Sequence, residues 1–106
     1  MNSVEKTQLE SKIIEALEMC YDPEIPVNIY ELGLVYAVNV SDAGDVDIKM
    51  TLTTPNCPAA ASLPSEVESK VTSIAQVKKV SVEVVWDPPW SPTKMSESAR
   101  LQLGMI

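Results

Sequence analysis

An alternating stretch at residues 46–53 constrains the fold of this chain more than any other part of the sequence. Valine, isoleucine, methionine and leucine fall on one side there, and aspartate, lysine and threonine fall on the other. A second alternating stretch covers residues 35–41, and a turn-forming segment at 42–45 separates the two. The pattern predicts an antiparallel hairpin. The residues expected together on one face of its first strand are Tyr36, Val38 and Val40.

Two other segments have the spacing of amphipathic helices. Residues 4–19 carry an apolar stripe that continues to Cys20, and Thr7 with Glu10 would form a capping box if that helix starts late. Residues 58–74 carry a second stripe. We therefore expect one helix before the hairpin and one after it.

The remaining elements are shorter. Valines alternate along residues 80–86 and predict a third strand. The loop at 87–92 contains Trp90, which we expect to plug the end of the core, although a contact anchor for a partner is the alternative. Residues 21–34 are expected to form a structured loop, and residues 96–103 a short helix.

The predicted element order is αββαβ with a short C-terminal helix, in a single domain over residues 1–106. The fold class is α/β, of the α+β type, with a small three-stranded sheet. Because each strand alternates, helices should cover one face of the sheet and leave the other partly solvated. We expect the strand order 2-1-3, with the third strand beside the first.

Composition excludes several functions. The formal net charge of -7 disfavours binding to nucleic acid or to an anionic membrane surface. No basic and apolar leader or membrane-length apolar run is visible, so a cytoplasmic location is expected. Histidine is absent, which excludes Ser-His-Asp triads, Cys-His dyads and histidine-bound metals within this chain. Two cysteines cannot alone complete a closed zinc site.

Cys57 is the first candidate for chemistry. It follows the second predicted strand, and Pro58 stands at a plausible first position of the next helix. Free backbone N–H groups and the helix dipole at such a position stabilise a thiolate, which is both a nucleophile and a soft metal ligand. The alternative is a small buried hydrophobe. That alternative is favoured for Cys20, which continues the apolar stripe of the first helix.

Two further sets of residues are candidates, the first in the acidic loop after Cys20 and the second just before Cys57. Asp22, Glu24 and Glu31 could serve as hard ligands, but capping of loop backbone groups is the favoured interpretation. Thr51 and Thr53 are expected on the polar, half-exposed face of the second strand. Their hydroxyls could bond the thiolate, or they could simply reflect β-propensity.

The chain resembles the SufT/PaaD-like (MIP18-type) iron–sulfur cluster assembly domain family over nearly its whole length. Three motifs in order carry the resemblance: DPEIPVNIYELGLVY at 22–36, TLTTPNCP at 51–58 and DPPW at 87–90. It implies an αββαβ fold, in agreement with the patterns above. It also implies an accessory role in iron–sulfur cluster assembly, as an assembly factor more than an enzyme.

The resemblance assigns the reactive thiol to Cys57, with Asp22, Glu24 and Thr53 as further cofactor-contacting residues. Iron–sulfur clusters are held by four thiolates, so one Cys57 per chain predicts no permanent cofactor. A transient cluster or iron on Cys57 is expected instead. The implied partners are iron–sulfur carrier or scaffold proteins, apo-client enzymes and a second copy in a homodimer, which would bring two Cys57 thiols.

Two alternatives remain open from the sequence. One is a stand-alone thiol enzyme that uses Cys57 for persulfide or peroxide chemistry. The other is an interaction module whose rigid loops bind a protein partner, for example in assembly of an aromatic-ring or phenylacetyl-CoA oxygenase. The first needs a lowered pKa of the Cys57 thiol, and the second does not need the thiol at all.

Overall fold

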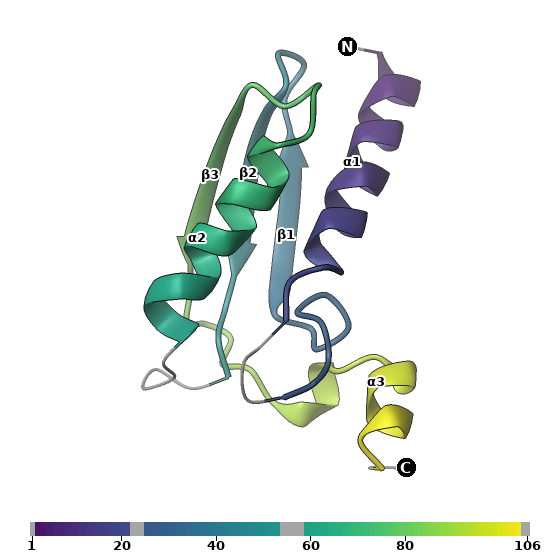
Figure 1. Cartoon of the computed structure of the whole chain (residues 1–106), viewed down its shortest axis with the longest axis vertical. Coiled ribbons are helices and arrows are strands. Elements are labelled where there is room, and N and C mark those ends of the chain that lie inside the picture. The colour runs from purple at the N-terminus through teal and green to yellow at the C-terminus, as the bar shows by residue number, and fades with distance from the viewer. Residues whose placement is uncertain (1, 22–24, 54–58, 105–106) are drawn as a thin grey trace.

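A computed structural model describes residues 2–21, 25–53 and 59–104, and it has the predicted α+β architecture (Figure 1). None of the helices in these residues is long and apolar enough to cross a membrane. The elements are α1 (Ser3–Leu17), β1 (Val35–Val40), β2 (Asp45–Met50), α2 (Ala59–Thr72), β3 (Lys79–Val84), the 3-10 helix η1 (Pro92–Lys94) and α3 (Glu97–Gln102).

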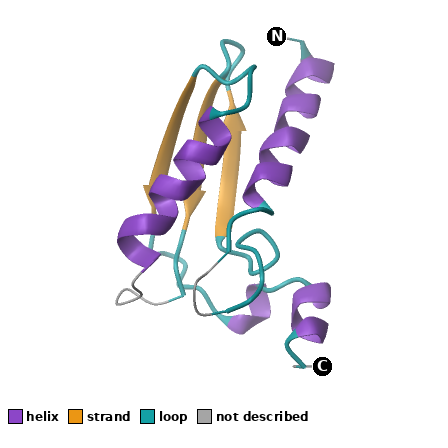
Figure 2. Ribbon diagram, in the orientation of Figure 1, coloured by secondary structure: helices purple, strands orange, loops and turns teal. Residues whose placement is uncertain are grey.

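Helices α1 and α2 cover one face of the sheet, as predicted (Figure 2). The central strand β2 is the most deeply buried, and its apolar side chains are at most 2% exposed. On the other face, Asn39, Ser81 and Glu83 are exposed to solvent. The apolar residues that α1, β2 and α2 contribute to the core are Leu9, Ile13, Leu17, Val46, Ile48, Met50, Leu63, Val67 and Val71.

The predicted sheet order is wrong. The observed order is β1-β2-β3, and β3 runs parallel to β2 without a register shift. The reason lies at Gly44, just before β2, where the chain returns from α2. The Lys78 amide donates to the Gly44 carbonyl at 2.9 Å, and a Cβ on Gly44 would lie 2.8 Å from the Gln76 carbonyl oxygen. This close approach starts β3 beside β2 and away from β1.

A β-bulge in β1 corrects a second expectation. Val38 and Val40 pair with core-facing residues of β2, but the register shifts between Val35 and Ala37. The extra residue, Tyr36, is left out of the ladder, and Val35 takes the place opposite Met50. Tyr36 therefore does not share the core face with Val38 and Val40.

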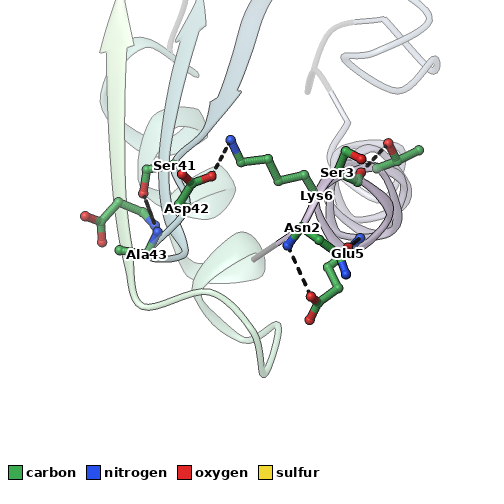
Figure 3. Close-up of polar contacts among 9 residues, drawn as sticks. Asn2, Ser3, Glu5, Lys6, Ser41, Asp42 and Ala43 are labelled. Carbon is green, nitrogen blue, oxygen red and sulfur yellow. Dashed lines mark hydrogen bonds and ion pairs between the residues drawn. The ribbon is translucent and has the colours of Figure 1, made fainter.

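The N-terminus of α1 is capped earlier than predicted (Figure 3). The Asn2 side chain accepts from the Glu5 amide at 2.8 Å, and the Glu5 carboxylate accepts from the Asn2 amide at 3.2 Å. This capping box replaces the one expected at Thr7, whose hydroxyl donates to the Ser3 carbonyl within the helix. Lys6 in the next position pairs with Asp42 of the β1–β2 turn at 2.6 Å.

Candidate functional site

The candidate site lies at the edge of the sheet where the parallel strands β2 and β3 end, which we call the carboxyl edge. Val85 follows β3 and donates its amide to the carbonyl of Met50, the last residue of β2, at 2.8 Å. Leu34, which precedes β1, accepts from the Thr51 amide at 2.8 Å. In open α/β sheets, the carboxyl ends of the strands are where ligands generally bind.

Three of the predicted site residues, Cys57, Asp22 and Glu24, lie outside the described residues. Their flanking residues are described, and backbone hydrogen bonds connect them. The Cys20 carbonyl accepts a hydrogen bond from the Ile29 amide at 2.9 Å, and the Ile29 carbonyl accepts one from the Leu34 amide at 3.1 Å. The Leu34 carbonyl accepts one from the Thr51 amide at 2.8 Å. The segments 22–24 and 54–58 therefore both start from one hydrogen-bonded platform at the carboxyl edge.

Helix α2 begins at Ala59, directly after the segment that contains Cys57. The first four N–H groups of a helix have no partner within the helix, and the macrodipole adds a partial positive charge there. Both effects would favour a thiolate placed just before the helix. The assignment of Cys57 as the reactive thiol stays a prediction. The structure adds that the helix that follows Cys57 in the sequence is 14 residues long.

The two threonines before this segment differ in their surroundings. Strand β2 ends at Met50, so Thr53 lies beyond it, half-buried in a bend. The alternation predicts a half-exposed Thr51, but this residue is 0% exposed. The Thr51 hydroxyl has no hydrogen-bond partner in the described part of the chain, which is costly for a buried polar group.

Cys20 is a core residue, as predicted. Its side chain is 0% exposed, and its thiol donates weakly to the Ala16 carbonyl at 3.7 Å. Burial raises the pKa of the Cys20 thiol and the Glu66 carboxylate raises it further, while the Lys70 ammonium acts in the opposite direction. Cys20 therefore stays a protonated thiol at neutral pH and is a poor metal ligand.

Glu31 has a structural role, although its carboxylate bonds a side-chain hydroxyl and not the loop backbone groups that the capping interpretation expected. Its amide donates to the Asn28 side chain at 2.9 Å, and its carbonyl accepts from the Ser96 amide at 2.8 Å. Its carboxylate also accepts from the Ser96 hydroxyl. Ser96 in turn caps α3 by accepting from the Ala99 amide at 3.0 Å. These bonds fix the C-terminal helix to the loop before β1.

Residues 85–96, which we call the C-terminal strap, run past the ends of all three strands. Beyond the contact with Met50, the Pro88 carbonyl of the strap accepts a hydrogen bond from the Tyr36 hydroxyl at 2.8 Å. Trp90, half-buried against the core, then donates its indole N–H to the Leu32 carbonyl at 2.7 Å. The plug interpretation of Trp90 is therefore confirmed.

Tyr36 is the residue of this region that the alternation pattern misplaced. The Lys94 ammonium lies over the Tyr36 ring, 5.2 Å from the ring centroid. Burial raises the pKa of the Tyr36 hydroxyl. The bulge that turns Tyr36 toward the strap has no glycine or other local sequence signal. The only sequence signal for this surface is the proline-rich motif at 87–90, which Tyr36 contacts through Pro88.

No three cysteine, aspartate or glutamate side chains within residues 2–21, 25–53 and 59–104 lie close enough together to hold a metal ion. The described platform flanks residues 22–24 and 54–58, which lie outside the described residues. Of the cysteine, histidine and carboxylate side chains that commonly bind metals, the chain has two cysteines, no histidine and fifteen Asp or Glu residues.

Residues 10–84 match the family described as "Iron-sulfur cluster assembly protein". A "Fe-S protein maturation auxiliary factor" from Porphyromonas gingivalis is 48% identical over 93% of this chain and 94% of its own length. A "Fe-S protein maturation auxiliary factor SufT" from Staphylococcus aureus is 39% identical over 82% of this chain and 99% of its own length. An "iron-sulfur cluster carrier protein" from Synechocystis matches 73% of this chain at 30% identity, but only 22% of its own length.

The fold agrees with these sequence matches. The crystal structure of the domain of unknown function DUF59 from Bacillus anthracis superimposes with a TM-score of 0.90, at 38% identity, over 99% of this chain and all of that chain. Fold, motif order and sequence therefore point to one group, and the chain belongs to the iron–sulfur cluster assembly protein family.

Proposed function

We propose that this chain is an accessory factor in the maturation of iron–sulfur proteins and that it acts through Cys57. The proposal rests on the match to a maturation auxiliary factor, which covers 93% of this chain at 48% identity. The position of Cys57 between β2 and α2 supplies the chemistry, because a helix N-terminus favours the thiolate. The cytoplasm is the proposed compartment.

The cluster would be the cargo of this factor and not its resident cofactor. A cluster is normally held by four thiolates, and this chain has two cysteines and no histidine. Cys20 is sealed in the core as a protonated thiol, so only Cys57 is left to bind iron or a cluster. The other ligands must come from another protein or a small thiol. Binding would therefore be transient, and Cys57 would take part in transfer and not in storage.

The proposed partners are cluster carriers and apo-enzymes. Support comes from the Synechocystis carrier protein, in which a segment similar to this chain is joined to a longer polypeptide. A domain that is covalently attached to a carrier in one protein would bind a separate carrier in another. We also propose a homodimer, and Asp22, Glu24 and Thr53 as residues that contact the cargo beside Cys57.

The two cysteines provide a matched test in cells that lack the endogenous gene. Cys57→Ser should abolish the recovery of a cluster-dependent enzyme, measured as its activity per amount of enzyme protein. Cys20→Ala should retain it, because Cys20 packs in the core and carries no chemistry. Circular dichroism of both purified variants controls for folding. Wild-type recovery with Cys57→Ser would overturn the role of the thiol.

A second measurement separates maturation from a stand-alone thiol enzyme. The rate of Cys57 alkylation against pH gives its pKa, which lies near 8.5 for an unperturbed thiol. A pull-down from extract with wild type and Cys57→Ser then tests for partners. Carriers or apo-enzymes retained by wild type alone support maturation. A lowered pKa without retained partners supports the thiol enzyme, and partners retained equally by both support an interaction module.

A further inference from the structure

Strand β3 is a free edge of the sheet. It pairs with β2 on one side, and no strand in the described part of the chain pairs with its other side, while α2 crosses its face (Figure 1). The opposite edge, β1, is interrupted by the bulge at Tyr36 and has α1 beside it. A bulge protects an edge against further pairing, but β3 is regular over all six residues. Of the two edges, β3 is therefore the one prepared to accept another strand.

The backbone groups of β3 alternate between the two sides. The amide of Val85 donates to Met50 of β2, and in a parallel ladder every second residue bonds the same neighbour. Ser81 and Glu83 thus direct their N–H and C=O groups to β2. Val80, Val82 and Val84 direct theirs outward, to the free side.

The side chains of β3 alternate as well. Val80, Val82 and Val84 lie on the helix-covered face, but they are only half-buried, whereas the apolar residues of β2 are at most 2% exposed. Lys79, Ser81 and Glu83 are exposed on the other face, and Glu83 also pairs with Lys49 of β2 at 3.1 Å. Within the described residues, the free edge therefore combines backbone groups without a partner strand, incompletely covered valines and charges of both signs.

We propose that two copies of this chain pair antiparallel along β3, with the two-fold axis at Ser81. In this register Val80 lies opposite Val82 of the partner subunit, and both have outward backbone groups, as a hydrogen-bonded pair requires. Lys79 then lies opposite Glu83 of the partner subunit. By symmetry this charge pair occurs twice, in the closely spaced non-hydrogen-bonded positions. The surface is complementary to itself in both backbone and charge.

This interface deepens the proposed function and rests on it for its biological meaning. In the paired sheet, the carboxyl edges of the two chains point in opposite directions. The ends of the two β3 strands would lie about 20 Å apart, six residues at ~3.3 Å each. The two Cys57 segments would therefore serve separate clusters. The expectation that a dimer brings two Cys57 thiols to one cluster would not apply to this arrangement.

A disulfide at the two-fold axis tests the register. Opposed non-hydrogen-bonded residues have Cα atoms about 4.5 Å apart, within the range for a disulfide. In a Cys57→Ser background, Ser81→Cys should form a disulfide-linked dimer on mild oxidation. Asn39→Cys, which lies on the same sheet face but on β1, is the matched control and should not. Equal cross-linking of both variants, or cross-linking of neither, overturns the proposal.

A charge exchange tests the same contact without a covalent bond. Sedimentation at up to about 100 μM should show the wild-type dimer. Lys79→Glu or Glu83→Lys alone should weaken it about tenfold, since each places like charges opposite one another. A mixture of the two variants should form a heterodimer of wild-type affinity. Lys12→Glu, an equal charge change on exposed α1, should have no effect.

A monomeric wild type at these concentrations, or a dimer that is unaffected by either single variant, overturns the interface. These measurements use purified protein without cargo, so they do not depend on Cys57. If Cys57→Ser supports enzyme maturation in cells while the β3 dimer forms, the function fails and the interface stands. If Cys57→Ser is inactive and the chain is monomeric, the interface fails and the function stands.

Discussion

The two ends of the sheet are closed in different ways. At the turn end, a short connection joins β1 to β2, and one exposed ion pair between Lys6 and Asp42 links it to α1. At the carboxyl edge, side-chain hydrogen bonds join segments that are 52 to 76 residues apart in sequence. Apart from the backbone contact of residues 76–78 with Gly44, the turn end is thus closed locally. The carboxyl edge depends on contacts between distant segments, which hold the flanks of the candidate site in place.

This difference indicates where the chain needs precise packing. A turn that joins neighbouring strands requires little beyond a suitable turn sequence. The proposed thiol-based transfer would need a platform that holds two loops and a helix start together, with backbone and aromatic contacts that exclude water. Apart from Gly44, which residues 76–78 approach closely, substitutions at the carboxyl edge should therefore cost more stability than substitutions at the turn end.

The largest expected effect is that of Gly33→Ala. Gly33 has a φ of +77°, and an added Cβ would lie 2.2 Å from the backbone carbonyl oxygen of Lys94 in the strap. The free energy of unfolding should fall by about 3 kcal/mol, measured by urea denaturation. Gly104→Ala is the matched control, because its φ is +74° but its Cβ would meet nothing within 4 Å. Equal losses in the two variants would mean that the strap contact is unimportant.

A smaller loss is expected for Trp90→Phe. The change keeps an aromatic plug but removes the indole N–H, which donates to the Leu32 carbonyl at 2.7 Å. The loss of this half-buried hydrogen bond should lower the free energy of unfolding by about 1 kcal/mol. Trp86→Phe removes an indole at a more exposed position in the same strap and serves as the control. If both changes had the same effect, the Leu32 contact would not contribute.

A third effect is confined to alkaline pH. The pKa of the buried Cys20 thiol is raised above its ordinary value, so the folded state holds this proton more tightly than the unfolded state does. Stability should be constant below that value and decrease as the pH rises through the folded-state pKa. Urea titrations at about pH 8 and pH 10 should show this decrease in wild type and a smaller one in Cys20→Ala. An identical decrease in both would assign the slope to other groups.

The smallest effect is expected at the turn end. Lys6 holds the pKa of the Asp42 carboxyl below its usual value, mainly through a hydrogen bond and then through its charge. Because this carboxylate is exposed, solvent and salt screen the pair. Asp42→Asn should leave the melting temperature within error of wild type at physiological salt. A shift as large as that of Trp90→Phe would contradict the comparison between the two ends.

Local patterns predicted most of the elements but not their arrangement. The stripe through Ile13 and Leu17 and the alternation along β2 depend only on which face is buried, so they could be recognised in the sequence. Sheet order depends on the close passage of residues 76–78 over Gly44, a contact between distant segments that no periodicity encodes. The Tyr36 bulge and the burial of Thr51 escaped prediction for the same reason.

At the candidate site, the structure confirms the core position of Cys20, while the role of Cys57 stays a prediction. The two cysteines could be distinguished from the sequence, because Cys20 continues an apolar stripe and Cys57 stands between a strand and a helix start. The motif at 87–90 marked the strap through its prolines and Trp90. The bonds of Glu31 to Ser96 join residues far apart in sequence, so the loop composition alone could not separate this anchoring carboxylate from a possible ligand.

The sealed position of Cys20 has a practical consequence for experiments on the native chain. A maleimide added to the folded protein would leave the Cys20 sulfhydryl unmodified, because side chains of the interior shield it. Fluorophores or spin labels could then be directed to other positions without first removing Cys20. Label taken up by Cys20 only after denaturant is added would report the fraction of unfolded molecules in the same sample.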